Sequence, residues 1–259
     1  MSGSADEAVL FETVEDHIAI ITINRPDAAN AVNDAVRHGL FAAFARFEQN
    51  PALLTAILTG AGPKVFSAGS DLKEMAERGV AVLPPDHNVV LGENVDVTKP
   101  VIAAVNGAAY AGGWMMAQMC DLCIAADTAR FAITEAKVGR SMPWSVPLKT
   151  MIPQRVWMEL LLTGDPISAQ RAYEIGFVNH VVPAAELMPR ALAMARTIAA
   201  NAPLTVRAAK EMVYLAQEMG QAGARRAAEH VFDRVFHSAD AQEGPEAFRE
   251  KRPPVWSGA

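Results

Sequence analysis

The sequence has few cysteines and no excess of positive charge, and each shortage excludes a class of protein. Its 259 residues include only two cysteines, Cys120 and Cys123, too few for the disulfide framework of a small secreted domain. Their spacing matches a redox pair, but no second pair accompanies them, so we interpret them as buried, reduced thiols. The formal net charge of −6 argues against general nucleic-acid binding, which needs a basic face.

Histidines are sparse as well. The six histidines are scattered along the chain, and no two of them have the spacing that places both ligands of a metal on one helical face. We therefore predict no metal site.

The chain has no recognisable secretory signal. Its first residues, MSGSADEAV, lack a basic region followed by an apolar stretch, so we expect a cytoplasmic protein. The longest uncharged run lies between Lys99 and Asp121, and about 20 apolar residues suffice to span a membrane. Asn106-Gly107 and Gly112-Gly113 interrupt the run. We predict a buried strand, a tight turn and a buried helix there, and no membrane partner.

Short β-branched runs alternate with helical patterns through the first two thirds of the chain. Ile18 to Ile23 and Val101 to Val105 are typical of buried strands. Towards the end the patterns are only helical, near residues 186–201, 205–217 and 221–236. This order predicts an α/β protein with a βαβ core and an appended C-terminal helical region.

Two loops of small residues stand out because they leave backbone amides accessible. One is the segment Phe66 to Asp71, and the other ends at Gly112-Gly113, directly before the predicted buried helix. Small side chains let a ligand approach the main chain, and amides at the start of a helix attract negative charge. We therefore predict a site for a developing anion at the centre of the protein.

Several motifs in a fixed order resemble the crotonase, or enoyl-CoA hydratase/isomerase, superfamily, and together they span nearly the whole chain. The motifs are Asn24-Arg25-Pro26, Ala29-Asn30-Ala31, Phe66 to Leu72, Lys99 to Gly107, Gly112-Gly113, Cys120-Asp121, Glu135, Leu162-Thr163-Gly164, Gly176-Phe177-Val178 and the tail from Glu243 to Arg252. The match is far more specific than any one of them.

The resemblance implies a spiral of ββα units over residues 1–200 and a helical trimerisation region over residues 201–259. It also implies a homotrimer or a dimer of trimers, an acyl-CoA thioester as ligand, and no cofactor other than the coenzyme A of the substrate. The oxyanion hole is expected at the backbone amides of Ser70 and Gly112. The coenzyme A contacts are expected at Ala28, Ala29, Ala31, Ser67, Ala68 and Lys251.

One departure from the family pattern affects the expected chemistry. Typical hydratases of this family carry two glutamates; the second corresponds to Glu135, but the first falls at Met115. A methionine transfers no proton, so Glu135 becomes the principal acid/base. The segment after Gly139 also differs. We predict an acyl pocket lined by Trp114, Met115, Met142 and Trp144.

A single carboxylate suits moving a double bond between two positions of an enoyl-CoA, because one base can take and return the proton. Hydration by one glutamate stays open. Alternatives are a non-catalytic acyl-CoA-binding protein and a specialised CoA-ester dehydratase, decarboxylase or hydrolase. Asp86, His87 and Glu93 could replace the missing acid, although solvated loop charges are the simpler interpretation.

Overall fold

The computed structural model describes residues 7–79 and 86–259. In this part of the chain the strands form one sheet of six, in the order β1-β2-β3-β5-β7-β10, and one of four, in the order β4-β6-β8-β9. The strands of the larger sheet are β1 (Val9–Val14), β2 (Ile18–Ile23), β3 (Thr55–Gly60), β5 (Val101–Val105), β7 (Leu122–Ala126) and β10 (His180–Val182). The strands of the smaller sheet are β4 (Val65–Ser67), β6 (Ala108–Tyr110), β8 (Arg130–Ala132) and β9 (Ile167–Ser168).

From β3 to β8, consecutive strands alternate between the two sheets. β3 is followed by β4 and a helix, β5 by β6 and a helix, and β7 by β8 and a short 3₁₀ helix. The strands of successive units pair in parallel, as in β3 with β5 and β4 with β6, whereas β1 pairs with β2 and β8 with β9 in antiparallel orientation. This repeat of strand, strand and helix is the ββα unit that the family resemblance implies, and the predicted fold class is confirmed.

The central stretch from Lys99 to Asp121 folds largely as predicted. β5 is buried along its whole length, as expected for a parallel strand covered on both faces. The buried helix is α3 (Gly112–Met119). Between them lies β6, a strand of three residues. It was not predicted because the turn signals Asn106-Gly107 and Gly112-Gly113 lie on either side of it. Among the described residues, no helix is long and apolar enough to cross a membrane.

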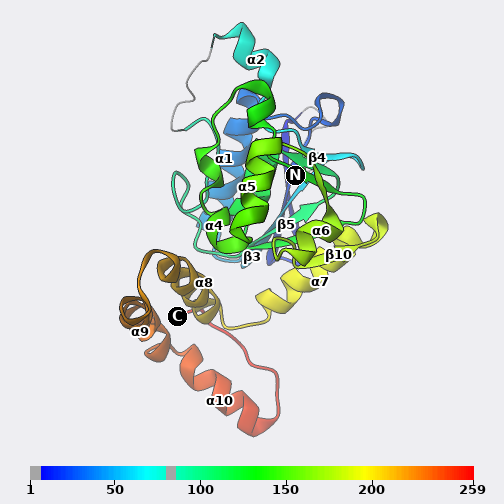
Figure 1. The fold of residues 1–259 in the computed structure, drawn as a ribbon. Coiled ribbons are helices and arrows are strands. Elements are labelled where there is room, and N and C mark those ends of the chain that lie inside the picture. The colour runs from blue at the N-terminus through cyan, green and yellow to red at the C-terminus, as the bar shows by residue number, and fades with distance from the viewer. Residues whose placement is uncertain (1–6, 80–85) are drawn as a thin grey trace.

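Of the helices that flank the sheets in Figure 1, α1 (Asp34–Gln49) and α2 (Leu72–Glu77) begin at polar side-chain caps. The Asn33 side chain accepts from the Val36 amide at 3.0 Å, and Asp71 accepts from the Glu74 amide at 3.3 Å. Such caps satisfy otherwise unpaired amides at a helix start. The helices of this region are α1 (Asp34–Gln49), α2 (Leu72–Glu77), α4 (Leu148–Met151), α5 (Gln154–Thr163), α6 (Ala169–Glu174) and α7 (Leu187–Ala199), and the 3₁₀ helices are η1 (Pro26–Ala28), η2 (Glu135–Val138), η3 (Pro143–Ser145) and η4 (Ala184–Glu186).

Three helices form a separate group at the C-terminal end: α8 (Pro203–Glu218), α9 (Gln221–Phe236) and α10 (Asp240–Glu250). Figure 1 shows this group extending away from the sheets. Helix α7 ends at Ala199 and α8 begins at Pro203, so the two helices are separated near the predicted boundary at residue 200. The sequence did not indicate α10, because Gly244 and Pro245, which disfavour helix interiors, lie inside it.

Gly107→Ala should destabilise the protein severely, because the turn between β5 and β6 has no room for a methyl group. A β-carbon at this position would lie 2.1 Å from the Lys64 carbonyl oxygen, which already accepts from the Ala108 amide at 3.0 Å. We expect a loss of about 3 kcal/mol or more in thermal or urea unfolding. Gly220→Ala is the control, since its β-carbon would meet nothing within 4 Å. Equal stability of the two variants would contradict this packing.

Candidate active site

The three residues predicted for chemistry follow the ends of three neighbouring strands. Ser70 comes three residues after β4, Gly112 two after β6 and Glu135 three after β8. The three strands are parallel and adjacent, in the order β4-β6-β8. The carboxyl ends of parallel strands meet at one edge of a sheet, which is where open α/β sheets bind ligands. Residues separated by 65 positions are thereby brought to a single edge.

The predicted oxyanion amides lie beside each other. A β-carbon built on Gly112 would lie 3.6 Å from the Ser70 amide nitrogen. A parallel bridge between Val32 and Ser70 uses the carbonyl of Gly69 and the amide of Asp71. Within residues 7–79 and 86–259, neither the Ser70 nor the Gly112 amide donates a hydrogen bond. Two unpaired donors at one place can stabilise a developing negative charge.

The loop around Ala28 to Ala31, which is predicted to contact coenzyme A, is hydrogen-bonded to the loop that precedes Ser70. The Ala68 amide donates to the Ala29 carbonyl at 3.1 Å. The Ser67 hydroxyl is buried and donates to the Asn30 carbonyl at 2.8 Å, so this side chain holds the two loops together. Ala29 and Asn30 both adopt left-handed backbone conformations. Ala28, Ala29, Ala31, Ser67 and Ala68 are thus brought together, and their contact with coenzyme A stays a prediction.

Glu135 is a buried carboxylate at the start of η2. It is 6% exposed, and its Oε1 accepts from the Trp144 indole nitrogen at 2.8 Å. Its Oε2 is buried and has no hydrogen-bond partner in the described structure. Burial raises the pKa of the Glu135 carboxyl, while its own backbone amide and Trp144 lower it by less. A raised carboxyl pKa brings a general base closer to neutral pH.

The four predicted pocket residues occupy different surroundings. Met115 is 4% exposed and lies on α3, three residues after Gly112. Met142 and Trp144 lie partly buried around η3. Trp114 is fully buried, and its ring packs 5.5 Å from Phe131 and 5.1 Å from Phe177. We therefore place the Trp114 ring in the aromatic core rather than in the pocket wall.

Gln118 is a polar residue of the site that the sequence analysis did not single out. It is 5% exposed on α3, and its Nε2 donates to the Trp144 carbonyl at 2.8 Å. In the sequence it resembles one more core position of an apolar helix. Only the fold of the loop after Gly139 brings Trp144 against it.

Of the three residues considered as a replacement acid, one contacts the site. His87 is buried, and its Nε2 lies 3.3 Å from the Ser70 hydroxyl. Burial lowers the pKa of His87, which favours the neutral imidazole at neutral pH. Asp86 and Glu93 are exposed, in agreement with the simpler interpretation of solvated loop charges.

Lys251 is not brought to the other predicted coenzyme A contacts. It lies at the C-terminal cap of α10, in the helical group that extends away from the sheets (Figure 1). The contact of Lys251 with coenzyme A therefore stays a prediction.

Neither cysteines nor metal ligands form a second site in the described residues. Cys120 and Cys123 are free and buried, and burial raises the pKa of Cys123 to about 12, which confirms the prediction of buried thiols. No group of three or more His, Cys, Asp or Glu side chains in residues 7–79 and 86–259 is arranged to hold a metal ion.

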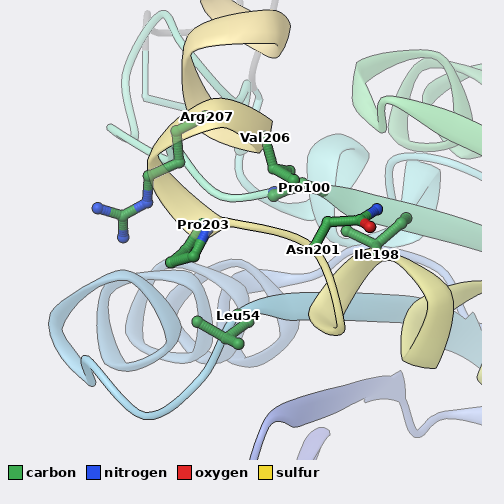
Figure 2. A pocket seen from close by; sticks show the side chains of 7 residues that line it. All are labelled: Leu54, Pro100, Ile198, Asn201, Pro203, Val206 and Arg207. Carbon is green, nitrogen blue, oxygen red and sulfur yellow. The ribbon is translucent and has the colours of Figure 1, made fainter. Parts of the chain in front are cut away.

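Figure 2 shows a hollow at the junction of α7 and α8. Its volume of about 10 Å³ accommodates about one water molecule. It contains none of the predicted site residues, so it is not the acyl-CoA site. Its lining residues are Leu54, Pro100, Ile198, Asn201, Pro203, Val206 and Arg207.

Glu135→Gln should stabilise the fold, and the gain should depend on pH. Because burial raises the pKa of Glu135, ionising this group in the folded state costs free energy. Below the usual carboxyl pKa both states are protonated and the cost is absent; the cost grows as the pH rises from the usual to the raised pKa and is constant above it. The Tm gain of Glu135→Gln should thus be small near about pH 4 and larger near about pH 8. A gain that shrinks as pH rises would contradict the burial of this carboxyl.

Comparison with known proteins identifies the family of the chain. Residues 13–259 match the enoyl-CoA hydratase/isomerase family. The carnitinyl-CoA dehydratase of Salmonella typhi is 41% identical over 247 residues, which cover 92% of this chain and 94% of that protein.

Solved structures show the same fold. The enoyl-CoA hydratase of Mycobacterium tuberculosis superposes with a TM-score of 0.91 at 41% identity, covering 98% of this chain and 100% of that one. A probable enoyl-CoA hydratase/isomerase of Mycobacterium abscessus gives 0.88 at 42% identity, covering 98% and 99%. From the family match and these likenesses, the chain belongs to the enoyl-CoA hydratase/isomerase family of crotonase-fold acyl-CoA enzymes.

Proposed function

We propose that the protein moves protons at the α-carbon of an acyl-CoA thioester, with Glu135 as the single acid/base. The observation that carries this proposal is the convergence of Ser70, Gly112 and Glu135 at the ends of β4, β6 and β8. Two unpaired amides and one buried carboxylate of raised pKa are the groups that enolate chemistry requires.

The amides act on the thioester oxygen. When a base removes the α-proton, negative charge develops on that oxygen, and fixed N–H donors stabilise this charge more than they stabilise the neutral substrate. Removing one such donor costs roughly 3 kcal/mol of transition-state stabilisation in comparable sites. The unpaired Oε2 of Glu135 is the atom free to accept the proton.

Loss or addition of water is the reaction that the relatives favour, since one of them is named a carnitinyl-CoA dehydratase. In the dehydration direction Glu135 takes the α-proton of a 3-hydroxyacyl-CoA. The β-hydroxyl then leaves with a proton returned from Glu135, which yields a 2-enoyl-CoA and water. One carboxyl group performs both transfers, so the methionine at position 115 does not prevent this reaction.

Isomerisation is the second candidate, and Met115 is the observation that favours it. With no second carboxylate on α3, Glu135 is the one carboxylate that the proposal assigns to proton transfer. Glu135 would take a proton from the α-carbon of a 3-enoyl-CoA and return it to the γ-carbon, which gives the 2-enoyl isomer without any water.

The ligand and the assembly belong to the same proposal. The hydrogen-bonded loops of Ala28–Ala31 and Ser67–Ala68 would bind coenzyme A through their backbone. A homotrimer or a dimer of trimers would cover the exposed apolar side chains of the C-terminal region, which include Val213, Phe236, Phe248 and Val255. In such an assembly Lys251 would serve a neighbouring chain's ligand rather than its own.

Three substrates distinguish the candidates. Purified protein is offered 3-hydroxyacyl-CoA, 2-enoyl-CoA and 3-enoyl-CoA of four carbons, and the absorbance of the conjugated thioester is followed, with Glu135→Gln as control. Turnover of the first two supports hydration and dehydration, whereas turnover of the third alone supports isomerisation. Tight binding of all three without turnover would replace the proposal by a non-catalytic binding protein.

A further inference from the structure

Trp144 connects the proposed base to the helix of the oxyanion hole through two hydrogen bonds. Its indole nitrogen donates to Glu135 Oε1 at 2.8 Å, and its backbone carbonyl accepts from Gln118 Nε2 at 2.8 Å. Gln118 and Gly112 belong to the same helix, α3. The chain of contacts from Gln118 through Trp144 to Glu135 therefore fixes the carboxyl group relative to the Gly112 amide.

Gln118 is costly as a packing residue. It is 5% exposed, and its Oε1 is buried without a partner in the described structure. A buried acceptor left unpaired is unfavourable, and an apolar side chain of similar size would avoid this cost. Its neighbours Met115 and Met116 are such side chains. The hydrogen bond to Trp144 is the contact that a methionine at position 118 could not make.

The indole is suited to hold a base without competing with it. Its N–H only donates and does not titrate in the physiological range. By occupying Oε1 it selects one orientation of the carboxyl group and leaves Oε2 unpaired. A histidine or a second carboxylate at the same place would instead exchange protons with Glu135.

We propose that Trp144 is a positioning residue that holds Glu135 by Oε1, so that Oε2 alone takes and returns the substrate proton, and that Gln118 holds Trp144 in place. This inference rests on the proposed role of Glu135 and deepens it. It explains how a site with methionine at position 115 retains a defined geometry for its one carboxylate.

Trp144→Phe removes the indole N–H but keeps an aromatic ring. We expect kcat to fall about tenfold or more while KM stays within about twofold, since a misplaced base affects the transition state rather than binding. The indole hydrogen bond lowers the pKa of Glu135, so its loss should move the acid limb of the pH–rate profile to higher pH. Burial and the backbone amide of Glu135 itself are the other causes of its shift, and both stay in the variant.

The control is Trp256→Phe, which removes another indole hydrogen bond of 2.8 Å, to the Ala200 carbonyl, away from the site. Gln118→Met is the second variant, because it leaves Trp144 in place and removes only its anchor. Gln118→Met should also lower kcat, but by a smaller factor than Trp144→Phe does. The thermal transition of each variant identifies the folded ones.

The carboxyl group can also be titrated without turnover, by difference infrared spectroscopy of wild type and Trp144→Phe, with Glu135→Gln to assign the band. An acid limb and a carboxyl titration that both move upward support the inference. A fall in kcat with an unmoved titration would overturn it, because Trp144 would then be merely structural. If wild type turns over no CoA ester, the proposed function is wrong. The role of Trp144 is then tested by the infrared titration alone, and a Glu135 titration that is unchanged in Trp144→Phe would contradict it.

Discussion

Glu135→Gln should lower kcat on the protein's CoA ester by roughly 10²–10⁴-fold, the range that general acid–base catalysis contributes. Glutamine keeps the shape of the side chain, and its carbonyl oxygen can still accept from the Trp144 indole. It cannot take a proton. The loss should therefore appear in kcat, with KM changed little, in steady-state assays at the pH optimum.

The matched control is Glu218→Gln, an exposed position at the end of α8. Its kcat should equal that of wild type. If Glu135→Gln retained wild-type turnover, the acid/base would have to be another group. His87, 3.3 Å from the Ser70 hydroxyl, would then be the first residue to test.

Gly112→Val should lower kcat by roughly 10²–10³-fold, as expected when one oxyanion donor is lost. Even a β-carbon at this position lies 3.2 Å from Gly69 Cα and 3.6 Å from the Ser70 amide nitrogen. The larger valine must push the two amides apart or fill the space between them where the thioester oxygen binds. Alanine should have an intermediate effect, because a shift of a few tenths of an ångström accommodates it.

Gly220→Val tests whether a β-branched side chain is harmful in general, since this position has open space around it. It should leave kcat unchanged. Binding of coenzyme A by Gly112→Val, measured by calorimetry, should stay close to wild type because the thioester oxygen is not part of coenzyme A. A Gly112→Val variant with wild-type kcat would exclude an oxyanion hole at this amide.

The sequence predicts the elements of this protein better than their contacts. β-branched runs predict the buried strands, and the two loops of small residues predict where unpaired amides lie. Glu135 could be selected only because its position matches the family pattern, since a carboxylate at a helix start or in a salt bridge is otherwise the more common role. All these signals are local in the chain.

Trp144 and Gln118 illustrate what a single sequence does not contain. Trp144 was predicted as pocket wall, but its hydrogen bond to Glu135 depends on the 3₁₀ turn at Pro143–Ser145. Gln118 became part of the site only through contact with a loop 26 residues away. Trp114, predicted for the same wall, instead packs with Phe131 and Phe177. An aromatic residue on an apolar helix is suited to either place.

The most direct test of the account is exchange of the α-proton in D₂O. This measurement needs neither a double bond nor a leaving group, so it tests the amides and Glu135 apart from the choice between dehydration and isomerisation. Butyryl-CoA is incubated with wild type, Glu135→Gln and Gly112→Val, and deuterium at the α-carbon is followed by mass spectrometry. We expect exchange by wild type and its loss in both variants. Wild type that binds butyryl-CoA without exchange, or Glu135→Gln that exchanges at the wild-type rate, would contradict it.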